Sequence, residues 1–308
     1  MTSLRHKTLQ VGAAAAAAGA AAASYMAFEA QWPVCRRAEL AVPGLPAPWS
    51  GVTVLHLSDV HAGLFATNER SLEKVVNWAV PLEPDLVFLT GDMVGDPHRS
   101  TRTVELLARL QPPLGTFTVT GNHEYGLGKG PLAKARDAGS VWAAAGVTLL
   151  QDACIALPDR GGFRLVLCGA DYLTGGFGLV DGAGARDCAG ASVAPGSAAP
   201  ATQAAAAAPA GAATGRDFPI LLIHRPPSSD SPLAAVFPLA FAGHTHGGQL
   251  RVPGASGLRA LVDEPGEYLA GVYHWGEGRL VVSRGVGTSF LPFRLLTRPE
   301  ATLWRLAS

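Results

Sequence analysis

Short apolar runs that alternate with helical patterns are the feature that most constrains the fold of this chain. The runs 52–57, 85–90 and 115–120 are rich in Val, Leu, Phe and Thr, as buried strands are. Between these runs, apolar residues recur at helical spacing in 68–80 and in 101–110. Alternation of strands and helices is typical of an α/β layered fold, and we predict that class.

Six more apolar runs follow, and their character changes toward the C-terminus. The last three are not separated by long helical patterns, so they predict a second sheet, mixed or antiparallel, after the alternating part. The six runs are 163–168, 219–224, 238–243, 267–275, 278–287 and 300–306.

The first 30 residues differ from the rest of the chain. Arg5, His6 and Lys7 precede an uncharged, alanine-rich run over residues 11–27. A basic flank before an apolar stretch is typical of a signal peptide or a membrane anchor, and about 17 residues is near the lower limit for a membrane span. We therefore expect a membrane-associated or exported protein. A soluble alanine-rich helix and an organelle transit peptide stay open, since no acidic residue precedes Glu29.

The chain is expected to have three parts and one insertion. Residues 1–30 form the signal peptide or anchor, and residues 31–50, with four prolines, are predicted to be a linker. Residues 51–308 form one domain. Within it, 175–216 consists mostly of Ala, Gly, Pro and Ser, which bury too little apolar surface to offset the entropy of ordering, so we expect a mobile insertion.

Charge and cysteine content exclude several classes of protein. The 24 Lys and Arg residues balance the 24 Asp and Glu residues, so no basic field for nucleic acid is expected. The cysteines contain no C-x-x-C pair, which excludes a zinc ribbon and a thioredoxin-like motif. Their spacing neither requires nor excludes disulfides. The four cysteines are Cys35, Cys154, Cys168 and Cys188.

Five of the apolar runs end in residues that can bind metal. Ligands of α/β sheets bind beyond the carboxyl ends of the strands, so we expect these side chains to converge. Taken singly, an Asp after a strand is often a helix cap and Gly-Asn is often a turn, but five such coincidences are hard to explain in that way. In chain order the residues are Asp59, His61, Asp92, Asn122, His123, Glu124, His224, His244 and His246.

The donor types indicate the chemistry. Carboxylate, imidazole and amide oxygen together suit Mn, Fe or Zn. Seven candidate ligands exceed the three or four protein ligands of a single catalytic zinc, and they fit two metals that share a carboxylate. Two such metals can stabilise the attacking and leaving oxygens of a phosphoryl transfer.

The ordered motifs D-x-H, G-D, G-N-H-E, H and G-H-T-H resemble those of the calcineurin-like metallophosphoesterase superfamily over most of residues 50–306. The part that begins with GHTHGGQLRVPG is similar to membrane-anchored phosphohydrolases, some of which resemble UDP-diacylglucosamine pyrophosphatases. This resemblance implies a four-layer α-β-β-α sandwich of two mixed sheets flanked by helices. It also implies a metal-dependent phosphoric ester hydrolase with two metal ions, Mn, Fe or Zn.

The resemblance also implies a role for each donor, with one donor shared between the metals. The first metal would be held by Asp59, His61 and His246, the second by Asn122, His224 and His244, and both by Asp92.

Catalysis would then use a hydroxide between the two metals to attack phosphorus. His123 would not be a ligand but would stabilise or protonate the leaving oxygen, and Glu124 could accept a hydrogen bond from His123. The sequence departs from the family pattern at two places. Glu124 stands where many relatives have Asp, and Gly95 stands where many have an acidic residue, with Asp96 next to it.

We therefore expect a phosphoesterase that cleaves a phosphodiester or a pyrophosphate in a small-molecule or lipid-linked substrate. The alternatives are a phosphomonoesterase or protein phosphatase, and a catalytically silent scaffold of the same fold. Arg225 could face a substrate phosphate or be an ordinary surface residue. Core packing is favoured for Trp275, Phe290 and Phe293 over an apolar lip for an acyl chain.

Overall fold

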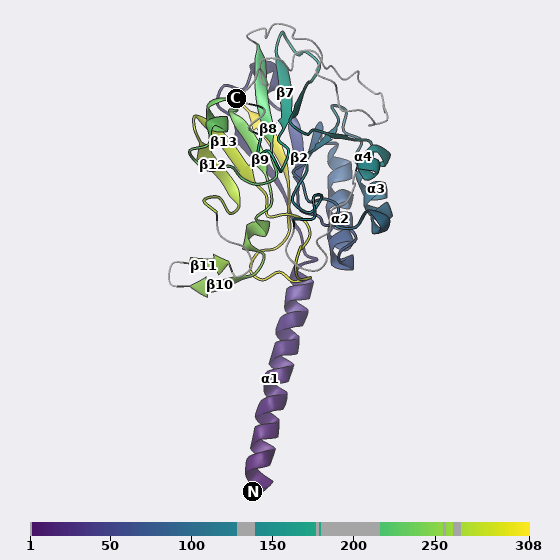
Figure 1. The fold of residues 1–308 in the computed structure, drawn as a ribbon, viewed down its shortest axis with the longest axis vertical. Coiled ribbons are helices and arrows are strands. Elements are labelled where there is room, and N and C mark those ends of the chain that lie inside the picture. Colours follow the sequence, from purple (N-terminus) through teal and green to yellow (C-terminus); the bar gives the residue numbers. More distant parts are fainter. Residues whose placement is uncertain (1, 128–138, 177–178, 180–215, 255–256, 261–265) are drawn as a thin grey trace.

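A computed structural model describes the chain except residues 1, 128–138, 177–178, 180–215, 255–256 and 261–265. Two six-stranded sheets form the domain, and a single long helix, α1 (Thr2–Glu29), projects from one end of it (Figure 1). The predicted insertion at 175–216 falls largely outside the described residues.

The first sheet is mixed, because one of its five strand pairings is antiparallel. β14 runs antiparallel to β2, and the other neighbours pair in parallel. In spatial order its strands are β1 (Val34–Ala41), β14 (Glu300–Ala307), β2 (Thr53–Leu57), β3 (Leu86–Leu89), β4 (Thr116–Thr118) and β5 (Val147–Leu149).

The second sheet is also mixed, with a parallel centre and an antiparallel pair at each edge. A separate antiparallel hairpin, β10–β11, lies outside both sheets. In spatial order the second sheet consists of β12 (Gly271–Trp275), β13 (Gly278–Val282), β9 (Leu239–Ala242), β8 (Asp217–Leu222), β7 (Arg164–Gly169) and β6 (Ala153–Ala156), and the hairpin consists of β10 (Arg251–Gly254) and β11 (Gly257–Ala260).

Helices cover the outer face of the first sheet (Figure 1). They are α2 (Ala66–Ala79), α3 (Thr101–Leu107) and α4 (Gly139–Ala144). Among the described residues, the outer face of the second sheet is covered by the short 3-10 helix η6 (Pro232–Ala235) and by neighbouring loops. The remaining 3-10 turns are η1 (Ala47–Trp49), η2 (Val80–Leu82), η3 (Pro97–Arg99) and η7 (His246–Gly248).

Alternation along the strands divides the apolar residues among three core clusters. In β2, Val54 packs between the two sheets, whereas Leu55 packs toward the helices. In β8, Ile220 packs between the sheets and Leu221 packs on the outer face. Each fully buried side chain of this kind stabilises the fold by about 1.5–3 kcal/mol, so the strand alternation fixes the order of the layers. The predicted α/β class with two large mixed sheets is confirmed.

Two predictions about the chain ends are wrong. Residues 34–41, expected to belong to a linker, form edge strand β1, which pairs with β14 over eight residues. Leu40 and Val42 are buried there, so the segment adds to the core despite its neighbouring prolines. The run 300–306, assigned to the second sheet, lies in the first as β14, because it pairs with β2 and buries Ala301 beside the helices.

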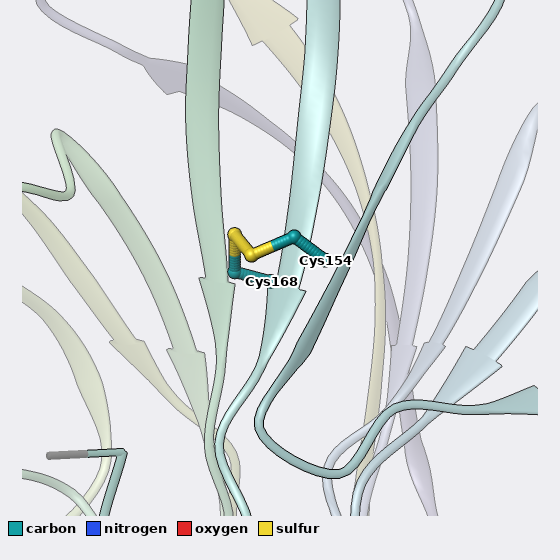
Figure 2. Close-up of a disulfide and its surroundings, with 2 residues drawn as sticks. All are labelled: Cys154 and Cys168. Carbon is teal, nitrogen blue, oxygen red and sulfur yellow. A yellow bond between two sulfur atoms is a disulfide. The ribbon is translucent and has the colours of Figure 1, made fainter. Parts of the chain in front are cut away.

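A disulfide links Cys154 of β6 to Cys168 of β7 (Figure 2). The two residues are direct partners in the antiparallel pair, with their Cα atoms 4.0 Å apart. Cys35 is free and half-buried. The cysteine spacing had left disulfide pairing open, and the strand register is what selects this pair.

Helix α1 is long and apolar enough to cross a membrane. Its 21-residue segment Leu9–Glu29 contains an 18-residue window with a mean hydropathy of 1.4, and no residue of that window is buried. At 1.5 Å per residue the segment spans about 30 Å, the thickness of a bilayer's hydrocarbon core.

Candidate metal centre

The loops that carry the candidate donors begin where strands end, and both sheets contribute. β2, β3 and β4 end just before Asp59, Asp92 and Asn122, respectively. β8 and β9 of the second sheet end just before His224 and His244. Neighbours within each set run parallel, so their carboxyl ends share one edge. The side chains lie close together there, as the sequence pattern predicted.

The first group of donors is compact and buried. Nε2 of His61 lies 3.0 Å from Nε2 of His246. Nε2 of His246 lies 3.6 Å from Oδ1 of Asp59. Asp59 and His61 are fully buried and His246 is 3% exposed. These three donors therefore surround one small, largely buried volume.

The second group of donors adjoins the first through Asp92. Nε2 of His224 lies 3.4 Å from Oδ2 of Asp92 and 3.1 Å from Oδ1 of Asn122. Nδ1 of His244 lies 3.1 Å from Nε2 of His224. The same Oδ2 of Asp92 is 3.7 Å from Nε2 of His61 in the first group. One carboxylate oxygen thus faces donors of both groups.

The backbone of the donor loops is unusual. Left-handed backbone is uncommon outside glycine and costs about 1–3 kcal/mol at other residues, so it persists only where the surroundings fix it. Such residues concentrate at binding and active sites. Five of the seven candidate donors have positive φ, namely Asp59 (52°), His61 (49°), Asp92 (52°), His244 (71°) and His246 (49°).

Hydrogen bonds orient the donors before any ligand binds. The main-chain carbonyl of Thr90 lies 2.7 Å from Nδ1 of His224, so a proton on Nδ1 is satisfied and Nε2 is left to face Asp92. The carboxylate of Asp59 accepts the main-chain N–H of His244 at 3.0 Å. Oδ1 of Asp92 accepts the main-chain N–H of His123 at 2.8 Å, which leaves Oδ2 for the donor groups.

Burial and charge act against each other in this centre. Burial opposes ionisation of Asp92, but the neighbouring His224 holds the pKa of Asp92 well below its usual range. Burial also lowers the pKa of His224, but Asp92 outweighs it and raises that pKa to about 9. Burial raises the pKa of Asp59 to about 7. Asp92 and His224 therefore stabilise one another's charge, whereas Asp59 is left with a costly buried charge.

Glu124 does not orient His123, contrary to the suggestion from the sequence. Its carboxylate accepts the main-chain N–H groups of Asp92 at 3.2 Å and of Met93 at 3.1 Å. It also accepts the N–H of Gly121 at 2.8 Å. Glu124 thus joins the loop after β3 to the loop after β4, and its longer side chain holds Asp92 in place from behind.

Glycines allow the loops to approach the donors closely. A Cβ on Gly121 would collide with Oδ1 of Asp92, and a Cβ on Gly243 would lie 2.6 Å from Oδ2 of Asp59. Gly247 (φ 61°) and Gly248 (φ 82°) form the turn after His246. At Gly95, where relatives were expected to carry an acidic residue, a Cβ would collide with Leu64.

Arg294 is a buried residue beside the donor His246 that none of the sequence motifs predicted. Its fully buried guanidinium donates to the main-chain oxygens of Gly287 at 2.6 Å and His246 at 3.1 Å. Burial lowers the pKa of Arg294 to about 10. The side chain thereby ties the loop after β13 to η7, which carries His246. A lone arginine within the apolar stretch FLPFRLL was the available signal.

Three other histidines lie apart from the candidate donors. His56 is 2% exposed, lies 2.9 Å from Oγ1 of Thr90 through Nε2, and contacts the ring of Phe241 edge-on. His98 and His274 are exposed. These three residues are not part of the donor groups.

A pocket of about 1130 Å³ opens beside the centre. Its wall includes five residues of the motif set, namely Asp92, Asn122, His123, His244 and His246. Exposed Arg225 also lines the pocket, so it lies on the side of the centre that faces the pocket. The favoured core assignment is wrong for Phe290, which lines the pocket and is 48% exposed, and is correct for Trp275, which is 1% exposed.

The donor chemistry fits metal cations. Two neutral imidazoles cannot both present lone pairs 3.0 Å apart, as Nε2 of His61 and Nε2 of His246 are, without a proton or a cation between them. Imidazole and carboxylate without thiolate favour Mn, Fe or Zn. Three groups in the described part of the chain have donor atoms within 4.8 Å of one another: Asp59–His61–His246, His61–Asp92–His123 and Asp92–His224–His244.

Comparison with known proteins agrees with this geometry. Residues 52–248 match the family described as "Calcineurin-like phosphoesterase". The uncharacterized metallophosphoesterase YkuE of Bacillus subtilis (strain 168) is 26% identical over 268 residues, covering 86% of this chain and 82% of that protein. The phosphodiesterase YaeI of Escherichia coli (strain K12) is 29% identical over 258 residues, covering 82% and 81%. A "transmembrane protein with metallophosphoesterase domain" from Danio rerio is 27% identical over 279 residues, covering 89% and 57%.

Proposed function

Because the chain belongs to the calcineurin-like phosphoesterase family, we propose that it is a two-metal phosphoesterase that hydrolyses a phosphodiester or pyrophosphate bond. Metal-dependent phosphoester hydrolysis follows from the family and from the His and Asp groups able to bind metal. The observation that supports two metals is the position of Asp92, whose Oδ2 faces the donors of both groups. The similarity to a phosphodiesterase favours a diester over a monoester.

The seven donors divide into two ligand sets that share Asp92. Bound cations would neutralise charge on the phosphoryl group and lower the pKa of nearby water. The protein's part is to hold its donors in place, through the Thr90 carbonyl at His224 and through Glu124 behind Asp92. One set comprises Asp59, His61, His246 and Asp92, and the other comprises Asn122, His224, His244 and Asp92.

His123 is the proposed proton donor to the leaving oxygen. Its Nε2 is 4.0 Å from Oδ2 of Asp92, and its side chain lines the pocket at 7% exposure. Its main-chain N–H donates a hydrogen bond to Oδ1 of Asp92, and this bond fixes the backbone position from which the imidazole ring extends. The ring therefore reaches the substrate side of the centre, where a leaving group would depart.

The pocket suits a substrate with a phosphate and an apolar part. Arg225 offers a cation for a phosphate oxygen. Leu127 (58% exposed), Leu173 (60%) and Phe290 (48%) present apolar surface around the same pocket. A phosphorylated lipid combines both features, which agrees with the resemblance of the C-terminal segment to lipid pyrophosphatases.

Helix α1 is proposed to be a membrane anchor that stays attached. Glu29 is 2% exposed and Ala30 is 1% exposed, so the end of the helix is packed against the domain. Cleavage of a signal peptide before β1 would remove these buried groups. The disulfide Cys154–Cys168 favours a domain on the oxidising side of the membrane. Intact mass and alkaline extraction of membranes test this proposal, since a cleaved, extractable protein would contradict it.

Hydrolysis of bis(p-nitrophenyl) phosphate and of p-nitrophenyl phosphate, each with added Mn²⁺, tests the proposed activity. We expect metal-dependent turnover with the diester preferred, and about two metals per chain by elemental analysis. Preference for the monoester would identify a phosphomonoesterase instead. A protein that binds no metal and is inactive would indicate a catalytically silent scaffold of the same fold. The matched control for the donor variant Asp92→Asn is Asp230→Asn, which changes an exposed carboxylate outside the donor groups.

A further inference from the structure

One loop, residues 289–298, connects the pocket to the anchor. Ser289, Phe290 and Leu291 at its start line the pocket beside the metal centre. Toward its end, the main-chain N–H of Arg294 donates to the carbonyl of Met26 in α1 at 3.1 Å. The mouth of the pocket is therefore within one short loop of the end of the helix.

The junction between α1 and the domain is held by several contacts. The main-chain N–H of Thr297 donates to Oε1 of Glu29 at 2.8 Å. Lys74 of α2 donates to the carbonyl of Gln31 at 2.6 Å, and Arg298 donates to that of Trp32 at 2.8 Å. Because two segments of the domain, α2 and the loop 289–298, hold this junction, the direction of α1 fixes which end of the domain faces the bilayer. Figure 1 shows that the β10–β11 hairpin lies at this same end.

Exposed aromatic residues surround the junction. Tyr25 is 47% exposed, Phe28 is 56% and Trp32 is 46%. The rings of Phe28 and Trp32 are 5.4 Å apart, and the guanidinium of Arg298 lies 3.6 Å from the centre of the Trp32 ring. Aromatic rings with neighbouring cations are typical of the region where a membrane helix meets the lipid headgroups.

Leu296 is the unusual residue of this surface. It is 44% exposed and has a left-handed backbone with φ 55°, which a leucine adopts only under constraint. It lies between Arg294 and Thr297, the two residues whose N–H groups bind α1. The anchor contacts therefore hold an apolar side chain outward, in a conformation that a glycine would adopt at lower cost.

We propose that the anchor face, defined as Tyr25, Phe28, Trp32 and Leu296, lies in the lipid interface, with Leu296 inserted among the acyl chains. The proposal rests on α1 being a membrane anchor. The fixed junction then holds the pocket rim at Phe290 next to the bilayer surface. A substrate could be engaged there with its apolar part still in the lipid.

The test places an NBD fluorophore at position 296 and measures its quenching by lipids. The full chain carries Cys35→Ser, Cys188→Ser and Leu296→Cys, and it is reconstituted into phosphatidylcholine–phosphatidylglycerol vesicles with or without doxyl-labelled lipid. The matched control is Val272→Cys in the same background, because Val272 is 43% exposed but lies in β12, at the edge of the second sheet. Thermal unfolding of both labelled proteins verifies that they are folded.

We expect doxyl lipid to quench the probe at 296 several-fold more than the probe at 272. Equal quenching at both positions, or none at either, in protein that floats with the vesicles would overturn the proposal. Shielding of the probe at 296 that depends on protein density and not on doxyl lipid would assign the face to a second copy of the chain. A protein that does not float with the vesicles would contradict both the membrane-anchor role of α1 and this proposal, but it would not affect the phosphoesterase assignment.

Discussion

The two donor groups differ in their access to solvent. Asp59 and His61 are fully buried, and neither is among the described residues that line the pocket. Asp92 and His244 both line it, and His244 is half-buried. Of the described donors that belong to one group alone, His246 lines the pocket in the first group, and Asn122 and His244 line it in the second. The first group is therefore the more enclosed of the two. For the proposed pair of metals we infer a difference in role: the more enclosed first group would bind its metal more tightly, and the second group would exchange metal more easily.

The largest effect on activity is expected at Asp92, the donor that both groups share. Asp92→Asn removes the charge that faces both sets and leaves His224 without its partner. We expect kcat to fall by about 10³-fold and the metal content to fall below one per chain. Steady-state kinetics with elemental analysis check this. Retention of both metals would show that Asp92 does not bridge them.

His123→Ala tests the side of the centre that faces the pocket. Because the ring lines the pocket and is assigned to proton transfer, we expect kcat to fall by about 10²–10³-fold with both metals retained. Activity toward a substrate with a more acidic leaving group should fall less, since such a group needs no proton. Equal losses for both substrates would assign His123 to another role.

Separate variants of the two groups test the difference in metal binding directly. His244→Ala should lose one metal and regain activity when the Mn²⁺ concentration is raised, because solvent reaches this group. His61→Ala leaves a gap in the more enclosed first group, so the same Mn²⁺ concentration should restore less activity than it does in His244→Ala. In a Mn²⁺ titration, we expect His244→Ala to need roughly 10–100-fold more Mn²⁺ than the wild-type protein for half-maximal activity. Identical titration curves for the two variants would contradict unequal metals.

The smallest change in activity is expected for Glu124→Ala, which acts through the loops. It leaves the N–H groups of Asp92, Met93 and Gly121 without their acceptor. The free energy of unfolding should fall by about 1–3 kcal/mol in urea denaturation, with metal content little changed. Glu39→Ala, at an exposed position of β1, is the control and should change stability by less than about 0.5 kcal/mol.

The elements that the sequence predicted correctly are those determined by local pattern. β2, β3 and α2 lie within one or two residues of their expected bounds, since apolar periodicity reports burial directly. The donors could be predicted together because Asp59, Asp92 and the others occupy the same position after successive strands. Convergence follows from sheet geometry and needs no knowledge of loop detail.

The incorrect and missed features depend on contacts between distant segments. β1 was hidden by prolines on both sides of it, and the place of β14 depends on its pairing with β2, across about 250 residues. The acceptor role of Glu124 arises from the backbone of another loop, and the contacts of Arg294 arise from the turn at His246. Local pattern carries no signal for such pairings.

The position of β14 has a consequence for biosynthesis. β1 and β2 are close in sequence, yet the last strand along the chain lies between them, and it is the sole strand neighbour of β1 in the described sheet. Because translation proceeds from the N-terminus, α1 and β2 leave the ribosome well before β14. The strand that leads into the Asp59 loop therefore gains its second neighbour only after β14 has been synthesised. A nascent chain stalled before residue 300 should be protease-sensitive, and maturation of the centre should follow the synthesis of β14.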